Sequence, residues 1–342
     1  MIKRILYGLI LGLAWWSGGG CTEKKTRAVK SSPLVEPVLH FGCCDASAGV
    51  AVSSNLFLVA NDEDNRLRVY RRDRSGLPVQ AFEVGSFLGV DARKPESDLE
   101  ASARIDDRIY WITSHGRSRT GQERESRHRF FATSIHLQGE KVELKTVGRP
   151  YERLLEDLVS EPGLARFRLQ AASLLPPKEP GALNIEGLCR TPENHLLIGF
   201  RNPIPNGQAL IVPLLNPAAL PEGKSAQFGQ PVLLDLGGRG VRDMAYANDR
   251  YLIAAGSFDG KGQSKLYEWA GGAAVPVEFK HTHLKGVNVE AILVYPGAAP
   301  DEIQVLSDDG TRKVGAGDCK LLKDARQKRF RSYWIKLDAP VK

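Results

Sequence analysis

Three short apolar runs in the middle of the chain decide the fold: Asn184-Ile-Glu-Gly-Leu-Cys-Arg190, Leu196-Leu-Ile-Gly-Phe-Arg201 and Ala209-Leu-Ile-Val-Pro-Leu-Leu215. Each has the length and the aliphatic content of a β-strand, and a few turn residues separate it from the next. A fourth run follows at Pro231-Val-Leu-Leu-Asp-Leu236. Four consecutive strands with short connections form one small antiparallel sheet, so residues 184–236 read as one structural unit.

The same unit recurs along the chain. Second strands are predicted at 57–62, 110–115, 196–201, 251–257 and 303–309, and third strands begin at Arg66, Arg129, Ala209, Lys265 and Arg331. Fourth strands begin at Val79, Val142, Pro231 and Ala274, and the last unit lacks one. Four-stranded antiparallel units repeating every roughly 45 to 55 residues are typical of propeller blades.

The sequence therefore predicts an all-β protein, a β-propeller with five blades. The segment 37–41 precedes the first unit and can supply the missing strand of the last blade, which closes the ring and hides its edge strands. Six blades are the alternative, because the interval from residue 98 to 184 is long. That extra length predicts a helical insertion near 150–180, since apolar residues recur there at helical spacing: Tyr151, Leu154, Leu155, Leu158 and Val159.

The N-terminus has the pattern of a secretory signal. Lys3 and Arg4 precede the apolar run 5–16, and small residues at 17–20 precede Cys21. We expect residues 1–21 to be the signal, with two alternatives: Cys21 is lipidated, or the signal is simply cleaved. Residues 22–36 are expected to form a flexible tether. Residues 37–342 would then be a single propeller domain, exported to the periplasm or anchored to the cell envelope, with membrane contact only through the N-terminal lipid.

The net charge limits the expected partners, and the cysteines predict a disulfide. Removal of Lys3 and Arg4 lowers the formal charge from +7 to +5, and no basic helical stripe accompanies it, so nucleic acid is not an expected partner. Export permits disulfides. We expect one of the vicinal pair Cys43 and Cys44 to bridge to Cys319, because both loops open on one face, and Cys189 to be a buried free thiol.

Long insertions gather in the loops that precede a first strand or follow a second strand: residues 115–129, 149–183 and 308–330. In an antiparallel blade these two kinds of loop open on the same face, called here the insertion-rich face. The opposite face is expected to carry only short turns. Because functional residues concentrate on loops held by a rigid scaffold, we expect the site on the insertion-rich face.

Repeated carboxylates are the first candidate site residues. Alignment of the first strands places Ser47 at the same position as four acids, Glu100, Glu186, Asp243 and Glu290. First strands line the channel of a propeller, so these acids are candidate ligands for a hard cation such as calcium. The alternative is that they accept hydrogen bonds from neighbouring blades and tie the ring together.

Basic residues are the second group. Arg117, Arg201 and Arg242 are candidates to bind an anionic ligand, and His115 and Arg117 are candidate catalytic residues, with His115 as general base. The alternatives are that Arg201 and Arg242 pair with the repeated carboxylates, that Arg117 lies in a solvated loop, and that His115 is a plain hydrogen-bonding residue.

Several motifs together resemble a bacterial family known as domain of unknown function 3616. They are Asp98-Leu-Glu100, Tyr110-Trp-Ile-Thr-Ser-His-Gly-Arg117, Asn184-Ile-Glu-Gly-Leu188, Gly199-Phe-Arg-Asn-Pro203 and Gly240-Val-Arg-Asp243. The resemblance covers about residues 40–338 and implies a propeller-like β protein, often exported, with no established activity. The repeated Glu pattern is also loosely similar to the esterase-like relatives of phytase.

These features predict a propeller that binds a small anionic or metal-bridged ligand on its insertion-rich face. A calcium-assisted phosphoesterase or esterase is the first alternative, and a scaffold for another envelope protein is the second. The absence of GxSxG, HExxH and GxxxxGK[ST] motifs from the sequence argues against the standard hydrolase and nucleotide-binding sites.

Overall fold

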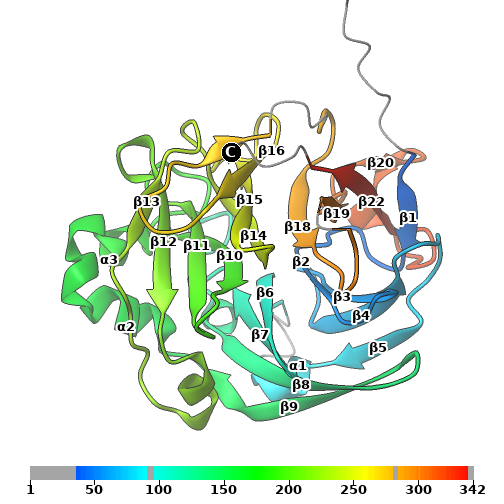
Figure 1. The fold of residues 1–342 in the computed structure, drawn as a ribbon, viewed down its shortest axis with the longest axis horizontal. Coiled ribbons are helices and arrows are strands. Elements are labelled where there is room, and N and C mark those ends of the chain that lie inside the picture. Colours follow the sequence, from blue (N-terminus) through cyan, green and yellow to red (C-terminus); the bar gives the residue numbers. More distant parts are fainter. Residues whose placement is uncertain (1–35, 91–95, 280–283, 300, 338–342) are drawn as a thin grey trace, which may run out of the picture. The chain divides into compact units, whose positions relative to one another are not determined.

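A computed structural model describes residues 36–90, 96–279, 284–299 and 301–337 (Figure 1). The signal predicted for residues 1–21, with Cys21, and the tether predicted for residues 22–36, except Glu36, lie outside these residues. Within the unit that begins at Val35, the described strands form five four-stranded antiparallel sheets arranged as a ring, a five-bladed β-propeller. The predicted fold class is confirmed, and the six-bladed alternative is wrong.

Each blade runs outward from its first strand. Blade one holds β2 (Ala48–Ala51), β3 (Leu56–Ala60), β4 (Arg66–Arg71) and β5 (Gln80–Glu83). Blade two holds β6 (Leu99–Ile105), β7 (Arg108–Thr113), β8 (Phe130–Gln138) and β9 (Lys141–Tyr151). Blade three holds β10 (Asn184–Arg190), β11 (Leu196–Asn202), β12 (Ala209–Leu214) and β13 (Val232–Leu234). Blade four holds β14 (Gly240–Ala247), β15 (Arg250–Gly256), β16 (Lys265–Trp269) and β17 (Val277–Glu278).

Blade five combines the two ends of the described chain. It holds β18 (Val289–Leu293), β19 (Glu302–Ser307), β22 (Arg329–Lys336) and, on its outer edge, β1 (Val38–Phe41). β1 pairs antiparallel with β22, from Val38 opposite Ser332 to Phe41 opposite Arg329. The prediction that residues 37–41 complete the last sheet is therefore confirmed.

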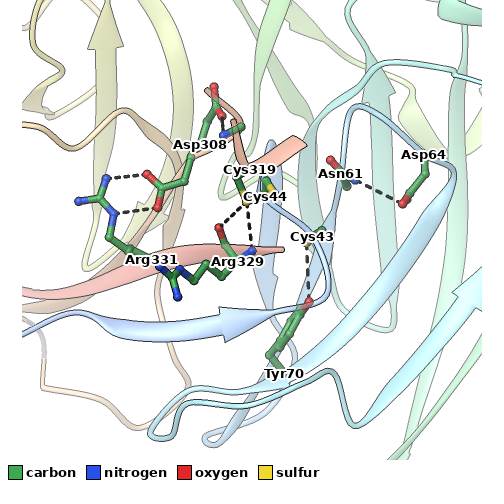
Figure 2. The surroundings of a disulfide bond; sticks show 11 residues. Cys43, Cys44, Asn61, Asp64, Tyr70, Asp308, Cys319, Arg329 and Arg331 are labelled. Atoms are coloured by element: carbon green, nitrogen blue, oxygen red, sulfur yellow. Dashed lines mark hydrogen bonds and ion pairs between the residues drawn. A yellow bond between two sulfur atoms is a disulfide. The ribbon is translucent and has the colours of Figure 1, made fainter. Parts of the chain in front are cut away.

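A disulfide reinforces this closure. Cys44, just after β1, is bonded to Cys319 in the long loop between β19 and β22, while Cys43 and Cys189 are buried free thiols. Figure 2 shows Cys43 turned away from the bridge, with its sulfur 3.6 Å from the hydroxyl of Tyr70. The expected link to Cys319 and the expected free thiol at Cys189 are both confirmed.

The core consists of apolar layers between adjacent blades. All five residues of β3 are buried, because a middle strand of a blade is covered on one face by the preceding blade and on the other by the next. Between blades one and two, Trp111 stacks on Phe131 with ring centroids 6.3 Å apart. Each blade therefore depends on both of its neighbours, and stability is a property of the closed ring.

The first strands β2, β6, β10, β14 and β18 surround the centre of the ring (Figure 1). The insertion before β10 contains α2 (Leu154–Ser160), η2 (Pro162–Phe167) and α3 (Leu169–Ala172). Leu154 and Leu158 face the core as predicted, whereas Tyr151 ends β9 and is not helical. The remaining short elements are α1 (Gly85–Leu88), η1 (Glu125–Arg127), η3 (Pro205–Gly207), β20 (Lys313–Val314), β21 (Gly317–Asp318) and η5 (Cys319–Leu321).

One expectation about the faces is wrong. The connection between β12 and β13 spans residues 215–231, includes η4 (Pro217–Glu222), and opens on the opposite face. A long loop there is stable because Leu220 is fully buried and packs into the layer between blades two and three. The opposite face therefore carries more than short turns.

Candidate functional site

A β-bulge at the start of the first strand orients the axial side chains. In blades two to five the strand pairing skips one residue, and the skipped residues are Glu100, Glu186, Arg242 and Glu290. A bulge re-aims the side chain of its extra residue, and it recurs here at equivalent places in four blades. Blade four therefore presents Arg242 at the position of the glutamates, and the sequence alignment that placed Asp243 there is off by one residue.

Asp243 has a different role. Its Oδ2 accepts a hydrogen bond of 2.7 Å from the main-chain amide of Ile292 in blade five, and only 4% of the residue is exposed. Burial raises the pKa of Asp243 well above its ordinary value, and the amides of Ile292 and Met244 partly oppose that rise. Asp243 therefore ties two blades together, which is the structural alternative weighed for the repeated acids.

Arg242 lies between two of the glutamates. Its Nε is 3.1 Å from Oε2 of Glu186, and its Nη2 forms an ion pair with Glu290. Arg201 contacts the other oxygen of Glu186, with Nη1 2.5 Å from Oε1. All four of these side chains are more than nine-tenths buried. Arg201 and Arg242 thus neutralise Glu186 and Glu290, as the pairing alternative for the two arginines predicts.

A second set of polar residues stands two positions before the three bulge glutamates, whereas Gly240 has this place in blade four. Asn184 donates to Oε1 of Glu186 at 2.8 Å, and Asn288 donates to Oε1 of Glu290 at 3.0 Å and to Asp308 at 3.1 Å. The corresponding residues in blades one and two are Asp45 and Asp98. Sequence reasoning missed this set, although the repeated spacing is visible in Asp98-Leu-Glu100, Asn184-Ile-Glu186 and Asn288-Val-Glu290.

The side of the axis next to blades one and two is acidic. Carboxylate oxygens of Asp45, Asp62 and Glu63 lie within 4.8 Å of one another. Burial raises the pKa of Asp62 well above its ordinary value, and the charges of Asp45 and Asp98 raise it further. Burial likewise raises the pKa of Asp45 to about 9, with its hydrogen bond to Asp308 adding to the rise.

Glu100 belongs to this acidic side. Burial raises the pKa of its carboxyl well above the usual range, and the nearby charges of Asp98 and Glu186 act in the same direction. Among the described residues none donates a hydrogen bond to Glu100 or forms an ion pair with it. Of the three bulge glutamates, Glu100 is thus the one whose carboxylate is left available.

Buried polar atoms without hydrogen-bond partners gather at the same end of the channel. Ten such atoms occur among the described residues, and six of them lie here: Asp62 Oδ1, His115 Nε2, Arg127 Nε, Asn184 Oδ1, Glu186 Oε2 and Arg242 Nε. The last two face each other as the ion pair already described, which leaves four atoms without a partner. Native proteins leave few buried polar groups unsatisfied, so such a concentration indicates that a bound ion, ligand or water completes the site.

His115 is fully buried at the end of β7. Its Nδ1 lies 2.8 Å from the carbonyl oxygen of Thr113 and donates to it, which leaves Nε2 with a bare lone pair. The ring of His115 stacks in parallel on His128, with centroids 5.6 Å apart. Burial lowers the pKa of His115 to about 3, so the imidazole is neutral at physiological pH.

Arg117 is occupied by main-chain oxygens. Its Nε donates to Ser173 at 2.9 Å and its Nη1 donates to Gly121 at 3.1 Å. These bonds fasten the 115–129 loop to the helical insertion, so the loop is not simply solvated. Arg117 itself lines a small pocket of about 210 Å³ together with His128.

Cavities occur on both faces of the ring. A pocket of about 280 Å³ on the insertion-rich face is lined by Asn288 and Asp308 of the axial site. A larger cavity, about 770 Å³, opens at the other mouth of the channel, where the first strands of all five blades line it. The polar groups that lack partners nevertheless lie mainly at the insertion-rich end, so we place the candidate site there.

Solved structures share the fold at low sequence identity. The chain is similar to a glutaminyl cyclase of Myxococcus xanthus, with 13% identity and a TM-score of 0.45 over 89% of this chain and 97% of that chain. It is also similar to an aldose sugar dehydrogenase of Streptomyces coelicolor, solved with bound PQQ, with 13% identity and a TM-score of 0.42 over 88% of this chain and 97% of that chain. At this level the similarity concerns the fold alone.

Other comparisons address the family. No curated protein matches the sequence, and the looser likeness to the esterase-like relatives of phytase is not confirmed. Residues 133–296 match the model of the family described as "Protein of unknown function (DUF3616)", which confirms the family resemblance over that part of the chain.

Proposed function

We propose that this propeller binds a small ligand through a divalent cation, of the calcium class, held at the insertion-rich end of its channel. The observation that carries the proposal is the concentration of buried polar atoms without partners beside acids that no arginine neutralises. Asp62, whose Oδ1 has no partner, is the central example of the first, and Glu100, which pairs with no described arginine, is the central example of the second. A bound cation would supply both the missing partners of the polar atoms and the missing positive charge beside the acids.

The donor set suits a hard cation. Asp45, Asp62, Glu63 and Glu100 offer only oxygen atoms, which calcium prefers over nitrogen or sulfur. Without a cation, neighbouring carboxylates disfavour each other's charged form, in agreement with the raised pKa values of Asp45 and Asp62. Cation binding would therefore release protons from these groups.

The ligand itself is proposed to be a small anion that completes the coordination of the cation. Arg201 and Arg242, the sequence candidates for anion binding, are already paired with glutamates. The cation is thus the better source of positive charge for the anion. The proposal includes action outside the cytoplasm, because Lys3, Arg4 and the apolar run after them have the pattern of a secretory signal.

Thermal unfolding in calcium tests the proposal. A ligand that binds only the folded state stabilises it by about 2.7 kcal/mol at a concentration one hundred times its Kd. We expect calcium to raise the Tm of the wild type, and to do so much less in Glu100→Gln and Asp62→Asn. Glu83→Gln, at an exposed ion pair with Arg66, is the matched control. An unchanged Tm of the wild type at millimolar calcium would refute a calcium-class site.

The hydrolase alternative has one specific observation in its favour, the Nε2 atom of His115 that has no hydrogen-bond partner. The pKa of about 3 that burial gives this imidazole makes it a weak general base and counts against this version. In that version a cation-bound water attacks a phosphoester or ester, and His115 accepts its proton. Calcium-dependent hydrolysis of p-nitrophenyl phosphate or acetate that is lost in His115→Gln would establish it. Calcium binding without turnover would leave the protein a binding module.

A further inference from the structure

A second concavity on the insertion-rich face has a chemistry different from that of the axial site. It measures about 610 Å³ and lies between the helical insertion, the loops that follow β11 and β15, and the turn that precedes β14. Apolar side chains make most of its wall, among them Phe167, Leu175, Ile204 and Phe258. Its volume is within the range of small-molecule pockets, and its wall is that of a site for an apolar body.

Two arginines stand at this apolar wall. Arg166 and Arg168 line the pocket, and no carboxylate is among the described residues that line it. The guanidinium of Arg166 lies over the ring of Phe167, 4.8 Å from its centroid, which holds the charge against the wall. Neither arginine forms an ion pair with a described acidic residue, in contrast to Arg201 and Arg242.

The backbone conformation of Arg168 supports a role in ligand binding for its side chain. Arg168 joins η2 to α3 with φ of 52° and ψ of 42°, a left-handed conformation that glycine or asparagine adopts more readily. Backbone strain of this kind tends to persist at ligand sites. Here it places a second unpaired cation beside the same apolar wall.

From this combination we infer that the pocket binds a single-chain anionic amphiphile, with the apolar chain against Phe167 and Ile204 and the anionic head at Arg166 and Arg168. Guanidinium groups pair with carboxylate and phosphate alike. The head is therefore a carboxylate or a phosphate, and both are probed. The inference is independent of the axial cation, because Glu100 and Asp62 do not line this pocket.

Calorimetric titration of the full chain tests it, with EDTA present and each probe below its micelle concentration. The probes are dodecanoate, dodecyl phosphate, dodecanol and dodecyltrimethylammonium. We expect one or both anions to bind at least tenfold more tightly than the neutral and cationic probes, and the stronger anion identifies the head group. Equal binding of dodecanol, or no binding by either anion, would overturn the inference.

Variants separate charge from shape. Arg166→Gln combined with Arg168→Asn should weaken anion binding about tenfold and leave dodecanol binding unchanged, and asparagine accepts the left-handed backbone. Arg326→Gln, an exposed arginine that does not line the pocket, is the matched control. Ala171→Trp should weaken every probe by filling the pocket, whereas Glu100→Gln should weaken none. Retention of full anion affinity in the double variant would contradict the assigned head-group site.

Discussion

Nε of Arg242 lies 3.1 Å from Oε2 of Glu186, and the two residues occupy equivalent bulge positions in neighbouring blades. An arginine thus replaces a glutamate at one place in the ring, and its charge offsets the two acids beside it. On the side of blades one and two, Asp98 pairs with Arg127 and Glu63 pairs with Lys320. Asp62 and Glu100 form no ion pair with a described residue. The axial end is therefore divided into a neutralised half and an acidic half.

Glu186→Gln should destabilise the protein by about 3 to 5 kcal/mol, because it leaves the buried Arg201 without its charged partner and leaves Arg242 paired with Glu290 alone. Denaturant unfolding in calcium-free buffer measures this. Glu100→Gln is the contrasting variant. Its buried carboxyl already favours the neutral form, so the same experiment should show no loss, or a gain, in stability. Equal losses in the two variants would contradict the division into two halves.

The Cys44–Cys319 bond closes a loop with a sequence separation of 275 residues. Long loops give the largest entropic effect on the unfolded chain, so Cys319→Ala should lower the free energy of unfolding by about 2 to 5 kcal/mol. Cys189→Ala is the control for loss of a thiol in the core. Mass mapping under non-reducing conditions should recover the 44–319 peptide pair with Cys43 and Cys189 free. A bridge involving Cys43 would contradict the assignment.

β1 should be essential for blade five. A chain that begins at residue 36 should unfold at the same denaturant concentration as the full sequence, whereas one that begins at residue 42 should be less stable by several kcal/mol. The second chain keeps Cys44 but exposes the edge of β22 and the aromatic layer around Phe330. Denaturant unfolding followed by tryptophan fluorescence measures the difference. Equal midpoints for the two chains would show that the ring does not need β1.

His40 predicts a pH dependence of stability. Burial lowers its pKa from 6.5 to about 4 in the folded protein. Between these values the unfolded chain binds the proton more readily, so the stability is present above pH 6.5 and falls as the pH drops towards 4. The full effect is about 3 kcal/mol. In His40→Gln the loss of Tm between pH 7 and pH 4 should be smaller, and an unchanged slope would refute this assignment.

The blades could be read from the sequence because burial on both faces enforces apolar runs of strand length, as in Leu56–Ala60. The register of the first strands at the axis could not be read in the same way, because the alignment of these strands was made on their acidic residues. The buried residues Leu99, Ile185, Val241 and Val289 each precede a bulge. An alignment on these residues gives Arg242 the position of the glutamates. The partners of Arg117 lie 4 and 56 residues away on irregular segments, where no periodic pattern predicts contacts.

Ring closure at β1 also determines how the molecule responds to mechanical load. A pull on the N-terminal end reaches β1 first, and the force is borne by its four-residue pairing with β22. If that strand detaches, tension passes to Cys44 and, through the covalent bond, to Cys319 on the other side of the same junction. Extension then stops at the disulfide, and blades one to four stay enclosed within an unbroken covalent loop.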